Sequence, residues 1–111
     1  MPETVTPDKI KEVQFISLIM MIEESAMYGL GKLANPMTKK VERNLVQART
    51  AIDMLEMLSA KTKGNLNDHE KRFIENTLTQ LRLNFVEESE EDKKNSTNKE
   101  NISEGSTNEK E

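Results

Sequence analysis

The residues that could do chemistry in this chain are few, and their types exclude most catalytic and metal sites. His69 is the only histidine among 111 residues, and cysteine is absent. Zinc and copper sites need several nitrogen or sulfur ligands, and a nucleophilic triad needs a histidine beside its serine. The four glycines form neither a G-x-G-x-x-G pattern nor a P-loop. We therefore expect no enzyme activity, no metal and no cofactor.

One short segment resembles a phosphate-binding loop at first sight. It reads Lys61, Thr62, Lys63, Gly64, Asn65, Leu66. The segment follows a predicted helix, and the negative end of a helix dipole repels anions. We therefore interpret Gly64 as the left-handed cap of that helix, with Thr62 and Asn65 bonded to local backbone.

A cluster of cations lies in the first half of the second predicted helix. Its candidate members for a basic face are Lys39, Lys40, Arg43 and Arg49, and Glu42 is the only acidic residue among them. Such a face would bind phosphates without sequence preference. No aromatic residues lie between the cations to stack on bases, so RNA or ribosome association is the alternative function and not the leading one.

The first predicted helix carries more apolar residues than a small bundle can cover. The surplus is contiguous and rich in methionine, a side chain suited to adaptable contacts. The candidate interface residues are Ile16, Met20, Met21 and Met27, with Val46 and Met57 from the second helix. We interpret them as a self-association or partner face, although scattered surface apolar residues are also common. A homodimer is the simplest outcome.

Apolar residues that recur every three or four positions predict three helices, at residues 7–31, 39–63 and 68–87. Thr6 and Pro7 form a good helix start, and Asn67 with Glu70 forms a capping box for the third helix. The expected core positions are Phe15, Leu18, Ile19, Ile22 and Ala26, then Val41, Leu45, Ala48, Ile52, Leu55 and Leu58, and finally Ile74, Leu78, Leu81 and Phe85.

The short connection between the second and third helices forces them into an antiparallel hairpin, across which the first helix packs. The predicted class is an all-α, three-helix domain at residues 1–88. Residues 87–111 carry four lysines and nine acidic residues and almost no aliphatic side chain. Residues 89–111 are therefore expected to form a disordered acidic tail that folding does not need.

The two helices of the hairpin and the corner between them also resemble a known bacterial family. The segments AIDMLEMLSAKTKGNLNDHE and LTQLRLNFVE resemble the domain of unknown function 1844 family over roughly residues 14–87. The resemblance implies a small bacterial helical domain and implies no activity.

The chain begins without the pattern of a signal peptide, and its apolar run at residues 15–22 is too short to span a bilayer. We therefore expect a cytoplasmic protein without membrane contact. The leading hypothesis is a non-enzymatic module that associates with itself or with another protein.

Overall fold

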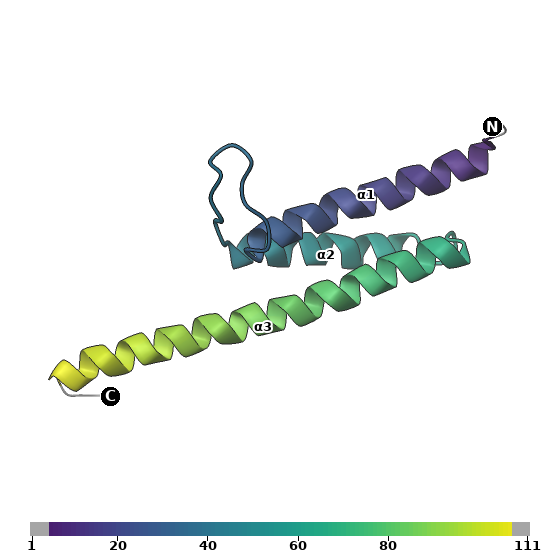
Figure 1. Cartoon of the computed structure of the whole chain (residues 1–111). Helices are drawn as coiled ribbons and strands as arrows, with labels where there is room; N and C mark the ends of the chain where they lie inside the picture. The colour runs from purple at the N-terminus through teal and green to yellow at the C-terminus, as the bar shows by residue number, and fades with distance from the viewer. Residues whose placement is uncertain (1–4, 108–111) are drawn as a thin grey trace.

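The computed structural model describes residues 5–107, with side chains for residues 5–93. Within that range it contains three helices and no strand: α1 (Pro7–Gly29), α2 (Leu45–Lys61) and α3 (Asp68–Thr107). The predicted all-α class is confirmed. In Figure 1, α1 and α2 lie side by side, and α3 runs along them and continues well past the body.

The start of α1 is set by Thr6, which precedes it, and by its first residue, Pro7. The Thr6 side chain accepts a hydrogen bond from the Lys9 amide at 3.1 Å, and Pro7 occupies the first helical position. Proline fits there because the first amide of a helix has no intrahelical partner.

The predicted start of α2 at residue 39 is wrong, since the helix begins at Leu45. Lys39 adopts a left-handed φ of 63°, and the Asn35 side chain accepts the Met37 amide at 2.8 Å, so this stretch is a loop. Asn44 then caps the helix by accepting the Gln47 amide at 3.1 Å. Val41, predicted for the core, lies in the loop and is 59% exposed.

The corner between α2 and α3 combines a turn and a cap. Gly64 has the predicted left-handed φ, at +87°, but it lies two residues after the cap residue Thr62 and forms part of a turn. The Asn65 amide closes that turn on the Thr62 carbonyl at 2.9 Å. The capping box is confirmed, because Asn67 and Glu70 each accept the other's backbone amide at 2.8 Å.

The three helices share one small core. Its buried residues are Ile19, Ala26, Leu30, Ala48, Ala51, Ile52, Leu55, Ile74, Leu78 and Leu81. Leu18, one position before Ile19 and therefore about 100° around the helix, is 42% exposed and does not join the core as predicted. The α1 and α2 backbones approach each other closely at Gly29, where a Cβ would lie 2.6 Å from the Ala48 nitrogen.

The third helix is longer than predicted, since it continues from the expected end near residue 87 to Thr107. Glutamate and lysine are good helix formers, and no proline or glycine occurs between residues 65 and 104. The backbone bonds of a helix are satisfied within it, so this extension needs no core of its own. Residues 108–111 of the predicted tail lie outside the described residues.

Candidate functional site

A shallow hollow on α1 brings together three of the predicted interface residues. Its apolar lining is Met20, Met21 and Met27 with Leu33 from the following loop, and its volume is about 580 Å³. Met20 and Met21 are 53% and 66% exposed, whereas Met27 is partly buried and packs against the core. Glu23 and Glu24 lie at the same hollow, so its rim is acidic.

The other three predicted interface residues do not line this hollow. Ile16 is half-buried on α1, and Val46 and Met57 are 76% and 50% exposed on α2. The predicted interface is therefore divided: the α1 methionines form one concave surface, and the α2 residues lie outside it.

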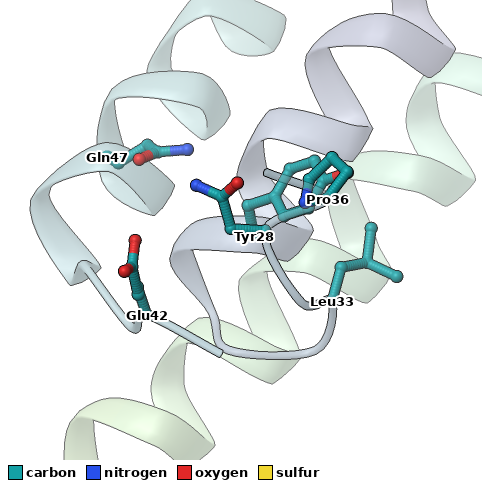
Figure 2. Close-up of a pocket in the computed structure, with 6 residues that line it drawn as sticks. Tyr28, Leu33, Pro36, Glu42 and Gln47 are labelled. Carbon is teal, nitrogen blue, oxygen red and sulfur yellow. The ribbon is translucent and has the colours of Figure 1, made fainter. Parts of the chain in front are cut away.

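The loop at residues 30–44 contributes Leu33 to the hollow and also borders a second, smaller cavity. Figure 2 shows Tyr28, Leu33, Pro36, Glu42 and Gln47 around this cavity of about 170 Å³. Binding sites for small molecules usually measure about 300–1,000 Å³, so this cavity is too small for most metabolites. Leu33 lines both spaces, and sequence reasoning missed it because it lies outside any helix.

The predicted basic face of the second helix does not exist as a single helical face. Lys39, Lys40 and Arg43 lie in the loop, and only Arg49 belongs to α2. Arg49 lies 3.2 Å from the Asp53 carboxylate and 5.9 Å from the centre of the Phe85 ring.

Arg43 is neutralised by the acidic end of the folded body. Its guanidinium lies 2.6 Å from the Glu88 carboxylate and also contacts the Asp92 carboxylate. Glu88 simultaneously pairs with Lys32 at 3.1 Å. Sequence reasoning missed these contacts because they join residues 45 and 56 positions apart.

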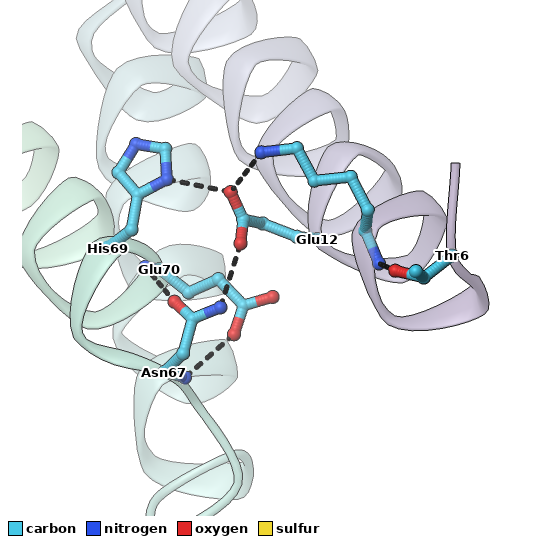
Figure 3. A network of polar contacts seen from close by, with 6 residues as sticks. Thr6, Glu12, Asn67, His69 and Glu70 are labelled. Atoms are coloured by element: carbon cyan, nitrogen blue, oxygen red, sulfur yellow. Dashed lines mark hydrogen bonds and ion pairs between the residues drawn. The ribbon is translucent and has the colours of Figure 1, made fainter. Parts of the chain in front are cut away.

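Glu12 joins the start of α1 to the corner before α3 (Figure 3). Its carboxylate accepts a hydrogen bond from the Asn67 side chain and lies 2.8 Å from Nδ1 of His69. These contacts, the one to His69 first, lower the pKa of Glu12 to about 2, and Lys9 adds to the effect. His69 thus acts in a structural contact, and residues 5–93 contain no group of three acidic, histidine or cysteine side chains arranged to hold a metal.

An open cleft of about 940 Å³ lies between α2 and α3. The corner residues Lys63, Gly64 and Leu66 line one end of it. Across its other end Arg82 pairs with Glu56 at 2.8 Å, so the hairpin has a cross-helix ion pair. Three acidic residues and three cations line the cleft, so their formal charges sum to zero.

The model of a protein family matches residues 12–87, which is more than half of the chain and includes the hairpin, the corner and the α1 hollow. The chain belongs to the family called Domain of unknown function (DUF1844). The predicted family is thereby confirmed. The DUF1844 match ends one residue before Glu88, so it contains Lys32 and Arg43 but neither of their acidic partners.

No curated protein and no solved structure matches the chain. Among the residues that the structure describes, no helix is both long and apolar enough to cross a membrane.

Proposed function

We propose that this DUF1844 protein is a non-enzymatic interaction module that forms a homodimer through α1. The observation that carries the proposal is the exposed hollow lined by Met20, Met21 and Met27. Burying one methionine or isoleucine side chain stabilises a complex by roughly 1.5–3 kcal/mol, so a few such residues supply a useful part of a dimer's free energy.

The spacing along α1 fits an antiparallel copy of the same helix. Val13, Met20 and Met27 are seven residues apart, which places them in one row on the helix. In a two-fold arrangement centred on Met20, Val13 faces Met27 of the second copy, and the Met20 side chains of the two copies face each other. Val13 is 54% exposed and therefore available for this contact.

Sedimentation equilibrium on the full chain at about 10–100 µM tests the proposal, because weak dimers dissociate in this range. The wild-type chain should be a dimer, and the double variant Met20→Glu, Met21→Glu should be a monomer with unchanged helicity. Met27 is left intact because it also packs on the core.

The matched control is Leu83→Glu, Met37→Glu. These two residues are 62% and 89% exposed, lie outside the hollow, and give the same change in charge. The control should remain a dimer. A monomeric wild type, or a dimer that survives the Met20 and Met21 substitutions, contradicts the proposal.

Nucleic-acid association through Lys39, Lys40, Arg43 and Arg49 stays the alternative, and the pairing of Arg43 with Glu88 reduces the support for it. RNA that co-purifies with the chain, and that is lost when the sample is treated with RNase, would favour this alternative. We also propose a cytoplasmic location, which fractionation of the native cells tests.

A further inference from the structure

We propose that Glu88 and Asp92 form a latch that holds the loop at residues 30–44 against α3 and thereby sets the shape of the methionine hollow. This inference rests on the proposed function, because the hollow is the docking surface assigned above. The latch makes the acidic part of α3 a regulator of that surface.

The latch is built around one shared carboxylate. One carboxylate, Glu88, bridges two cations from opposite ends of the loop, Lys32 at 3.1 Å and Arg43 at 2.6 Å. The other guanidinium nitrogen of Arg43 contacts Asp92 and lies 3.4 Å from the Glu88 carbonyl. Glu88 is only 18% exposed, so water and salt screen these pairs less than an isolated surface pair.

Leu33 connects the latch to the hollow. Leu33 follows Lys32 directly in the chain and lines the hollow together with the α1 methionines. The apolar side chains Leu33, Met37 and Val41 are all exposed, so the described loop has little core packing of its own beyond the buried Leu30. Releasing Lys32 and Arg43 therefore frees Leu33 to move, which opens the hollow beside Met27.

Hydrogen exchange of the loop amides tests whether the latch holds the loop. The Lys32 amide bonds to the Met27 carbonyl, and the Asn44 amide bonds to the Gly29 carbonyl, so both report on loop opening. The variant Glu88→Gln, Asp92→Asn should speed exchange at these amides by about 3–10-fold. The control Glu87→Gln, Glu91→Gln removes the same charge from the same helix and should leave exchange unchanged.

Oxidation of methionine by hydrogen peroxide tests the shape of the hollow without relying on dimer formation. The experiment is run at a concentration where the chain is a monomer. Met27 is half-buried beside Leu33 and should oxidise several-fold faster in the latch variant, because sulfoxide formation follows exposure. Met37, already 89% exposed, is the internal control and should not change.

The outcomes separate this inference from the proposed function. Faster loop exchange together with faster Met27 oxidation supports the latch, even if the wild-type chain proves to be a monomer and the homodimer fails. Unchanged loop exchange overturns the latch. Faster loop exchange with unchanged Met27 oxidation overturns its link to the hollow. Should the latch variant lose helicity, the double variant Lys32→Gln, Arg43→Gln breaks the same pairs from the loop side and is scored by the same two measurements.

Discussion

Two glycines in this chain are required for different physical reasons, and the difference can be measured. At Gly29 the reason is distance: an added Cβ would lie 2.6 Å from the Ala48 nitrogen and 2.7 Å from the Asn44 oxygen. Both neighbours are backbone atoms, so Gly29→Ala must push α1 and α2 apart. We expect a loss of about 1–3 kcal/mol, seen as a lower midpoint of urea unfolding.

At Gly64 the reason is the backbone angle. Its φ is +87°, and nothing lies within 4 Å of an added Cβ, so Gly64→Ala strains the backbone without a clash. The expected loss is about 1–2 kcal/mol in the free energy of unfolding. Gly64→Asn should cost less, because asparagine tolerates the left-handed region better than alanine. An alanine variant as stable as the wild type would show that the turn can change its conformation freely.

The contacts of Glu12 make stability depend on pH in acid. Its folded-state pKa is about 2 against an ordinary value of 4.5, so the stabilisation is complete above pH 4.5. It is lost as the pH falls from about 4.5 towards 2, because the unfolded chain takes up the proton first. Thermal unfolding of the wild type and of Glu12→Gln should therefore differ at pH 6 and converge near pH 2. Curves that stay equally far apart at both pH values would contradict this mechanism.

The helix ends that could be predicted are those fixed by neighbouring residues. Thr6 caps α1, and Asn67 with Glu70 caps α3. In each cap the hydrogen bond joins residues three positions apart in the sequence. The start of α2 could not be read in this way, because residues 39–43 have helical composition but lie in a loop. That loop is held by the left-handed backbone of Lys39 and by the pairing of Arg43 with Glu88. No pattern among neighbouring residues in the sequence predicts either feature.

The N-terminal cap of α2 gives a direct test of where that helix begins. Asn44→Ala removes the bond to the Gln47 amide and should lower the free energy of unfolding by about 0.5–2 kcal/mol. A helix that began at Lys39 would instead be capped by Thr38, so Thr38→Ala is the control and should have little effect. Both free energies of unfolding are measured with urea. A larger loss for Thr38→Ala than for Asn44→Ala would indicate that α2 begins near residue 39.

For the whole molecule, the composition of α1 predicted the surplus of methionine but not its shape. Three of the six expected interface residues share one hollow, and Leu33 from the following loop lines it with them. The position of Leu33 depends on a loop and on contacts with α3, both of which are tertiary features. The α2 residues Val46 and Met57 have the same apolar character and exposure but lie outside the hollow, so exposure alone does not identify a site.

The acidic C-terminal part of the chain, from Glu88 onward, can be divided experimentally into a part that supports the body and a part that does not. Ending the chain after Lys93 keeps Glu88 and Asp92 and should leave the melting temperature unchanged. Ending it after Glu87 removes both partners of Arg43. A shielded network of this size contributes about 1 kcal/mol, which corresponds to a drop of about 4–8 °C for a body of this length. A third chain ends after Lys93 and carries Glu88→Gln and Asp92→Asn. It separates the effect of losing these carboxylates from the effect of shortening α3. It should melt like the chain that ends at Glu87, because the charge pairs and not the length of α3 connect the tail to the body.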